Sequence, residues 1–236
     1  MSHILVTTAP LARRSLLAGA AAGACLVARP ALAANAQQEM VDDATKTIVS
    51  FSGEGAHPDF SKQLHDSVAV LIVPRLIKAG FIIGGEGGGG VMLVREKPAD
   101  GWSPPAFYSL ASASIGLQAG AQSAETVMLV RSRKALDRLM SDKVKLGADA
   151  GLAVATIGAG LEGSTTTAAG ADILAFARAK GLYGGISFEG SVLAADAEAN
   201  HAYYGVAATP RQILFERKAD NRGTAQLRAR LDAAAT

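Results

Sequence analysis

The sequence predicts an α+β fold: a curved, mainly antiparallel β-sheet or barrel-like sandwich, packed by short helices at the N-terminus, in the middle and at the C-terminus. At least six segments of strand character follow one another, joined by tight turns, which favours antiparallel pairing. Helical spacing of apolar residues occurs near both ends and in one central segment. The 236 residues include 26 glycines and only 5% aromatic residues. Small residues on strands permit the curvature that such a sheet needs.

The segment that follows residue 34 is predicted to contain two helices and then the first strands. Residues 39–51 have apolar side chains at helical spacing, and 59–66 form a second, short helix after a proline. Residues 67–73 are apolar and β-branched, and Pro74 is expected to end this strand. Over residues 81–95, two apolar stretches flank a run of glycines. This pattern predicts a strand, a glycine loop and a second strand.

The remaining elements are predicted by the same criteria. Apolar and polar residues alternate most regularly over 111–121, which predicts one long half-buried strand. Ser132 is a suitable N-cap for a helix over 132–140. Further strands are expected at 125–131, 144–154, 173–178 and 182–188, and further helices at 196–203, from Pro210, and around 226–231.

Residues 1–33 have the three parts of an export signal peptide. Arg13 and Arg14 supply positive charge, an apolar run of thirteen residues follows, and Ala31 and Ala33 form an A-x-A cleavage site. The apolar run is shorter than the ~20 residues that a membrane-spanning helix needs. We therefore expect cleavage after Ala33 and a periplasmic or secreted protein.

Two alternatives concern the same segment. The arginine pair followed by two leucines resembles a twin-arginine signal, so both this route and the general export route stay open. Cys25 follows Ala-Gly-Ala, which resembles a lipobox. Cleavage and acylation there would give a lipoprotein anchored to the membrane through Cys25.

The charge and cysteine content exclude several classes of protein. The chain carries 23 basic and 21 acidic side chains, and loss of residues 1–33 removes three arginines and no acid, which leaves a net charge of −1. A near-neutral chain gives no broad footprint for nucleic acid. One cysteine excludes a disulfide framework and a cysteine-based zinc site.

Motifs for catalysis are weak or incomplete. Residues 85–90 satisfy G-x-G-x-x-G literally, but a strand follows them where a dinucleotide site needs a helix, and the other kinase motifs are missing. His57 and His65 are eight residues apart, and no carboxylate completes a metal site with them. Ser187 lies in a predicted strand rather than on a nucleophile elbow. The sequence predicts no enzyme, no cofactor and no metal.

Three cations are candidates for contact with anionic lipid. Lys46 lies on the first predicted helix, and Arg75 and Lys78 follow the first strand. A cation near an anionic membrane surface contributes ~1 kcal/mol to binding. The alternative is ordinary solvation of helix and strand faces.

The order of motifs along the chain resembles the SYLF domain family, over most of the residues that follow the signal. The motifs are Ile77-Lys-Ala-Gly-Phe81, the Gly87–Gly90 run into Val91-Met-Leu-Val94, Gly101-Trp-Ser-Pro-Pro105, Ser114-Ile-Gly-Leu-Gln-Ala-Gly-Ala-Gln122, Val127-Met-Leu-Val130, Lys180-Gly-Leu-Tyr-Gly-Gly-Ile-Ser-Phe-Glu-Gly190, and Asn200 with Tyr203-Tyr204-Gly205. The resemblance implies a SYLF-like domain over 67–216, between a helical segment at 34–66 and a charged tail at 217–236.

The SYLF resemblance also implies binding of phospholipid or phosphoinositide, actin binding in some eukaryotic members, and no catalysis. The family's basic residues before the Asn-x-x-Tyr element are here Ala194-Ala-Asp-Ala-Glu198. We therefore expect an exported lipid-binding protein that meets anionic head groups at a membrane surface. The alternative is a structural or protein-interaction module of the cell envelope with an envelope protein as its partner. We do not expect actin binding for an exported, bacterial-type member.

Overall fold

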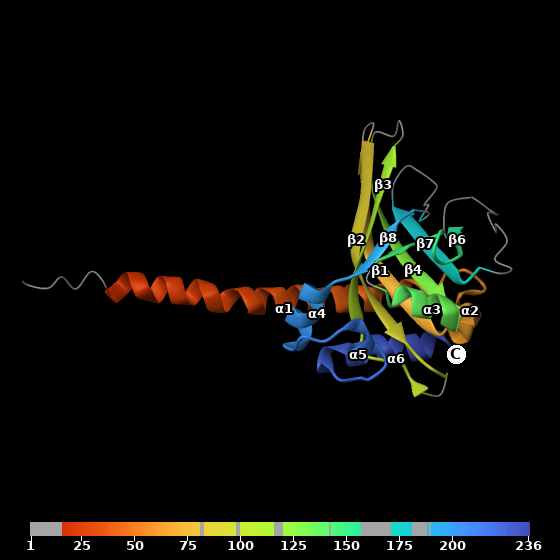
Figure 1. The fold of residues 1–236 in the computed structure, drawn as a ribbon. Helices are drawn as coiled ribbons and strands as arrows, with labels where there is room; N and C mark the ends of the chain where they lie inside the picture. The colour runs from red at the N-terminus through yellow and green to blue at the C-terminus, as the bar shows by residue number, and fades with distance from the viewer. Residues whose placement is uncertain are drawn as a thin grey trace, which may run out of the picture.

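The computed structural model describes residues 16–80, 83–97, 100–115, 120–141, 143–156, 171–180, 188 and 190–236. These residues form one eight-stranded, curved sheet with helices on both of its faces (Figure 1). The helices lie at the N-terminus, in the middle and at the C-terminus. The predicted α+β class is confirmed.

The sheet is antiparallel except at one edge. Its strands lie in the order β5-β8-β3-β2-β1-β4-β7-β6, and β6 pairs with β7 in parallel. The strands are β1 (Ala69–Gly80), β2 (Ile83–Val94), β3 (Ala106–Ile115), β4 (Gly120–Val130), β5 (Lys143–Lys145), β6 (Leu152–Thr156), β7 (Ile173–Lys180) and β8 (Val192–Ala195). The long strands β1 and β2 are therefore central, and each is paired on both sides.

Three of the described helices, α3, α4 and α5, begin at side-chain N-caps. They are α1 (Leu16–Ser52), α2 (Phe60–Asp66), α3 (Arg133–Leu139), α4 (Ala197–Tyr204), α5 (Pro210–Leu214) and α6 (Ala225–Ala234), with a short 3₁₀ turn at Arg222–Thr224. The Ser132 hydroxyl accepts a hydrogen bond from the Ala135 amide at 3.0 Å, as predicted. Thr209 and Gln212 form a capping box at α5.

Two hydrophobic cores lie on opposite faces of the sheet. On one face, α1, α2, α4 and α6 pack on side chains such as Val70 and Ile72 of β1. On the other face, α3 and α5 pack with Leu71 and Val73 of the same strand. This alternation is the period of two expected for a strand that is covered on both faces. The apolar face predicted for 39–51 is confirmed, with Val41, Ala44, Ile48 and Phe51 buried on α1.

The predicted glycine loop is wrong. Residues 83–94 form one continuous strand, β2, so the glycines lie inside the sheet between β1 and β3. The β1–β2 connection falls at residues 81–82, outside the described residues. Pro74 also does not end its strand. It lies in a β-bulge, and β1 continues to Gly80.

Two predicted strands are each divided in the structure. The alternation over 111–121 belongs to the end of β3 and the start of β4, separated by residues 116–119, which lie outside the described part of the chain. Residues 144–154 contribute to β5 and β6, which occupy opposite edges of the sheet. The predicted strand at 182–188 lies outside the described residues except for Phe188, which is buried.

The charged tail at 217–236 is part of the packed domain. Leu227 and Leu231 of α6 are fully buried in the core that α1 covers. Arg228 and Arg230 lie on the outer side of the same helix, in keeping with an amphipathic helix.

Candidate functional site

A bulge in the central strand β1 shapes the candidate site. The register of β1 against β2 shifts between Ile72 and Ile77, and its register against β4 shifts between Val73 and Leu76. One extra residue therefore lies on β1 at Pro74–Arg75. Proline cannot donate a ladder hydrogen bond, and bulges are where a sheet tolerates it. The bulge turns Arg75 and Ile77 toward α1.

The glycines of β2 make room for this bulge and for α1. A Cβ on Gly90 would lie 2.5 Å from the Ile72 carbonyl oxygen, and one on Gly88 would clash with the Arg75 carbonyl oxygen. On the other face of β2, a Cβ on Gly89 would lie 2.5 Å from the terminal methyl of Met40 on α1. The glycine run is thus required by close packing, and it forms no phosphate-binding loop.

The wall opposite the bulge is α1, which α4 holds in place. Tyr203 of α4 donates a hydrogen bond to Oε1 of Gln38 on α1 at 3.0 Å. Asn200 fixes α4 to β3, because its side chain accepts from the Phe107 amide at 2.9 Å and donates to the Phe107 carbonyl at 3.2 Å. Tyr204 donates to the Pro105 carbonyl oxygen at 2.6 Å.

Between these walls lies a groove, which we call the α1–β1 groove. Its main hollow has a volume of about 350 Å³. A second hollow of about 170 Å³ adjoins it and shares Asp43, Pro74 and Arg75. The main hollow is lined by Ala36, Glu39, Met40 and Asp43 of α1, Pro74, Arg75 and Ile77 of β1, and Gly87, Gly88 and Gly89 of β2.

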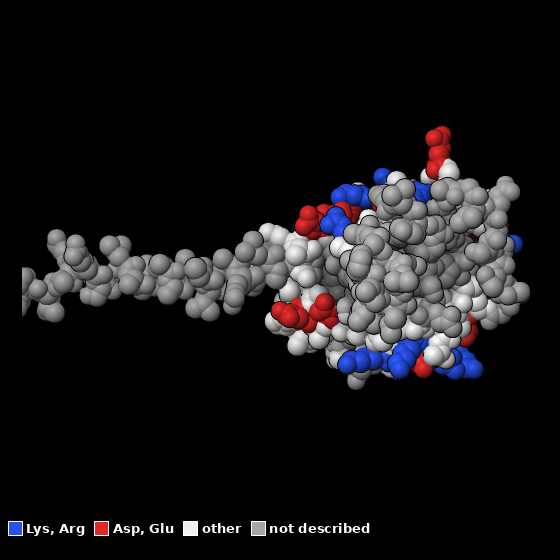
Figure 2. All heavy atoms as spheres, turned by 90° about the horizontal axis from the view of Figure 1, so that it is seen from above, with Lys and Arg blue, Asp and Glu red and all other residues white. Residues whose placement is uncertain are grey.

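The groove carries charge of both signs. Lys46 pairs with Asp43, with 2.7 Å between Nζ and Oδ1, and this hydrogen bond raises the pKa of Lys46. Glu39 contributes a second acid to the α1 wall. Arg75 is exposed and forms no hydrogen bond or ion pair with any described residue. Figure 2 shows one face of the molecule, where the described basic and acidic side chains lie close together around the edge.

The structure brings two of the three predicted lipid-binding cations together. Lys46 and Arg75 both line the second hollow. Lys78 shares the face of β1 that carries Leu76, opposite to the groove, and pairs across the strands with Glu86. Burial raises the pKa of Glu86, and the charge of Lys78 acts in the opposite direction.

The described part of the predicted signal is the first part of α1, which lies apart from this groove. Arg13 and Arg14 lie outside the described residues. Cys25, Ala31 and Ala33 lie on the first part of α1, where the structure describes the helix and not the side chains. Figure 1 shows this part of α1 extending away from the sheet. Within the described part of the chain, no helix is long and apolar enough to cross a membrane.

The sequence-based prediction missed the two features that make the groove. Ile77 is 50% exposed, although it lies inside a strand, because the bulge carries it away from the core. Glu39 is the first residue of the helix predicted over 39–51, and nothing in the sequence indicates what lies opposite it. A proline followed by a basic and two apolar residues inside a β-branched stretch could have suggested a bulge.

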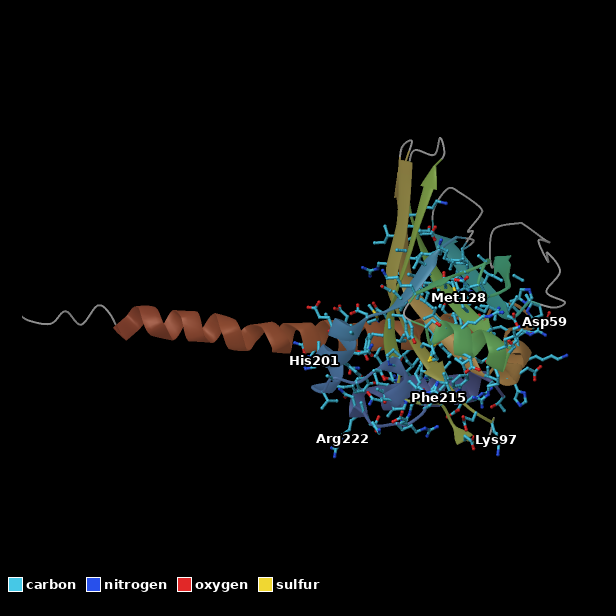
Figure 3. All side chains as sticks on the ribbon, viewed as in Figure 1. Asp59, Lys97, Met128, His201, Phe215 and Arg222 are labelled. Atoms are coloured by element: carbon cyan, nitrogen blue, oxygen red, sulfur yellow. The ribbon has the colours of Figure 1, made fainter. Side chains whose placement is uncertain are left out.

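The histidines form no metal site among the described residues. His57 packs edge-on against Phe176, with ring centroids 5.3 Å apart. His201 lies on the outer side of α4, far from Met128 in the sheet (Figure 3). No group of three or more histidine, cysteine or acidic side chains within the described ranges could hold a metal ion.

The Gly-Trp-Ser-Pro-Pro segment is likewise structural. The Arg95 guanidinium lies 4.4 Å from the centre of the Trp102 ring and donates to the carbonyl oxygens of Leu64 and His65 at the end of α2, both at 2.7 Å. Arginine at this position adds hydrogen bonds to carbonyl groups at a helix end, where the helix itself supplies no donors. Ser103 accepts from the amide of Val94 at 3.0 Å.

Comparison with known proteins now decides the family. The family model described as "Ysc84: Las17-binding protein actin regulator" matches residues 111–234, more than half of the chain. The chain belongs to the Ysc84, or SYLF, family. The matched range begins on β3 and includes α4, whereas α1, β1 and β2, which form most of the groove, precede it.

Relatives of this SYLF chain come from yeast and mammals. Protein YSC84 of Saccharomyces cerevisiae is 30% identical over 171 residues, which cover 71% of this chain and 36% of that protein. LAS seventeen-binding protein 3 of the same yeast is 31% identical over 150 residues, 62% of this chain and 32% of that protein. SH3 domain-containing YSC84-like protein 1 of Mus musculus is 31% identical over 146 residues, 61% of this chain and 43% of that protein.

The SYLF chain therefore spans less than half of the length of these curated relatives. Their names and the family description refer to binding and regulation, and one names an SH3 domain. The expectation that actin binding does not occur has no support here, because the family description names actin regulation.

Proposed function

We propose that this SYLF protein is a non-catalytic protein-binding module, and that its α1–β1 groove receives a segment of a partner protein. The observation that carries this proposal is a groove of about 350 Å³ in which exposed Ile77 and Arg75 lie beside acidic α1 residues, and Arg75 has no partner among the described residues. Contiguous apolar patches rimmed by polar residues are typical of interaction sites, and Ile77 shares its hollow with Met40 and Pro74. The family description, which names Las17 binding and actin regulation, and the name of the yeast relative LAS seventeen-binding protein 3 support protein partners in the family.

The mixed charge of the groove favours a protein segment over an anionic membrane surface. Asp43 neutralises Lys46, and Glu39 faces the same hollow as Arg75. A surface dense in negative charge would meet these acids as well as the arginine, and like charges in a binding interface oppose association. A protein segment presents charges of both signs at separate positions.

Photo-crosslinking in producing cells tests the proposal. A photoreactive residue in place of Ile77 should give a discrete protein adduct, which Arg75→Gln in the same chain should weaken. The matched control is Val206, which is also 50% exposed and lies outside the groove. Equal adducts at both positions, or adducts of Ile77 with phospholipid alone, would contradict a protein-binding groove.

Lipid binding is the second candidate function, and one observation favours it. Exposed Arg75 lies two residues from exposed Ile77, and a cation beside an apolar side chain suits the boundary between head groups and acyl chains. The protein should then sediment with anionic vesicles at low salt. Arg75→Ala together with Lys46→Ala should release it, whereas Lys78→Ala, on the other face of β1, should not.

We also propose that the protein is exported, with cleavage after Ala33. The signal-like sequence of residues 1–33 supports this proposal. The described α1 side chains that line the groove or contact α4 run from Ala36 onward. Cleavage after Ala33 would therefore leave these contacts in place.

A further inference from the structure

We infer that the segment bound in the α1–β1 groove is an extended peptide with an aliphatic side chain and a single carboxylate close together in its sequence. This inference rests on the proposed protein-binding function and specifies the partner's chemistry. It follows from four features of the groove, which concern its free charge, its acidic wall, its apolar floor and its length.

The free charge is that of Arg75. Of the cations on this side of the sheet, Lys46 is held by Asp43, and Arg178 donates to the hydroxyl of Ser50 and lies over the ring of Phe51. Arg75 alone of these three has no partner in the described part of the chain. A guanidinium binds a carboxylate through two parallel hydrogen bonds, so it is suited to a planar acid.

The acidic wall restricts the ligand to few negative charges. Glu39 and Asp43 lie along the α1 side of the same hollow as Arg75. A phosphorylated or otherwise polyanionic group would place its additional charge against these carboxylates. A single carboxylate directed at Arg75 avoids that repulsion.

The floor and the remaining lining are apolar and open. Met40, Pro74 and Ile77 supply apolar contacts around the glycines of β2. A Cβ on Gly87 would contact only the Leu110 carbonyl oxygen, at an ordinary 3.6 Å. The space above Gly87 can therefore receive a side chain, and its apolar surroundings select an aliphatic one.

The length of the groove along α1 sets the length of the bound segment. Its two hollows run along α1 from Ala36 to Thr47, which is roughly 16 Å at the rise of a helix. An extended chain covers that length with about five residues. Ile77 lines only the main hollow and Arg75 lines both hollows, so the aliphatic side chain and the carboxylate that they receive lie close together in the segment.

Selection from random seven-residue peptides displayed against the purified full-length chain tests the inference. The expected enrichment is an aliphatic residue together with one Asp or Glu within a stretch of about five residues. Changing that acid to its amide in the best synthetic peptide should weaken binding about tenfold, the size expected for loss of a charged hydrogen bond. On Arg75→Gln protein the same change should have less than about a twofold effect, because the two groups act as a pair.

A matched pair of glycine variants shows whether the selected peptides occupy the groove. Gly87→Val should abolish binding by filling the floor, and Gly85→Val should not, because a Cβ there meets nothing within 4 Å and Gly85 does not line the groove. Enrichment without an acid, or binding that survives Gly87→Val, would overturn the inference. The photo-crosslink at Ile77 is independent of peptide chemistry, so it would still report whether the groove binds protein.

Discussion

The glycines of β2 provide a quantitative test of how the sheet is built, through the substitution Gly88→Ala. The new Cβ would lie 3.1 Å from Cγ1 of Val73 and 3.2 Å from Cα of Leu76, and it would clash with the carbonyl oxygen of Arg75. Two of these three neighbours are backbone atoms of the bulge, which cannot rotate away. Adding a methyl to a packed interior costs about 1–3 kcal/mol. Alanine recovers roughly 0.5–1 kcal/mol of that, because glycine is unfavourable within a strand.

The expected net result is a loss of up to about 2.5 kcal/mol in the free energy of unfolding of Gly88→Ala, or up to roughly 10 °C in Tm for a chain of this size. Urea denaturation followed by circular dichroism measures it. Gly87→Ala is the control on the neighbouring residue of the same strand, because its Cβ meets only an atom at 3.6 Å. It should be neutral or up to ~1 kcal/mol more stable than the parent. If Gly88→Ala were as stable as Gly87→Ala, close packing would not be the reason for the glycine run.

Three further predictions concern α4, β2 and export. Asn200→Leu removes the hydrogen bonds that join α4 to β3 and should cost about 2–3 kcal/mol of stability in urea denaturation, whereas His201→Ala on the exposed side should cost under ~0.5. Burial raises the pKa of Glu86, so the folded state binds its proton more tightly and stability falls as pH rises through its ionisation. Glu86→Gln should therefore be more stable than the parent at pH ~7 and equal to it below pH ~4, and an unchanged pH profile would contradict this. Intact mass of protein from the envelope or medium should correspond to cleavage after Ala33, whereas an acylated chain beginning at Cys25 would show a lipoprotein.

The sequence predicted the fold class and most helices because those depend on local patterns. The apolar face of α1, the Ser132 cap and the start of α5 at Pro210 follow from residues close to one another in the chain. The strand boundaries failed where the decisive contact was distant. The glycine run was assigned to a loop because glycine disfavours strands, yet β1 and α1 approach β2 so closely that other residues would clash.

The candidate site was only partly predictable for the same reason. Charge and position singled out Lys46 and Arg75, which the structure does bring into one groove. Lys78 was grouped with Arg75 because it is near in sequence, and the alternation of β1 places it on the other face. Asp43 pairs with Lys46, whereas Arg75 has no partner among the residues that the structure describes. This difference depends on which helix face meets the bulge, and one sequence does not contain that information.

Stability and binding rest on different residues in this molecule. Trp102, Asn200 and Tyr203 belong to the signatures that resemble the family, and each is buried in a contact that joins a helix or turn to the sheet. Arg75 and Ile77 make few such contacts, because the bulge carries them to the surface. Substitutions at the first group should therefore reduce binding only by unfolding the protein or displacing α1. Substitutions of Arg75 and Ile77 should change the choice of partner at nearly constant stability, which would allow one scaffold to serve different partners.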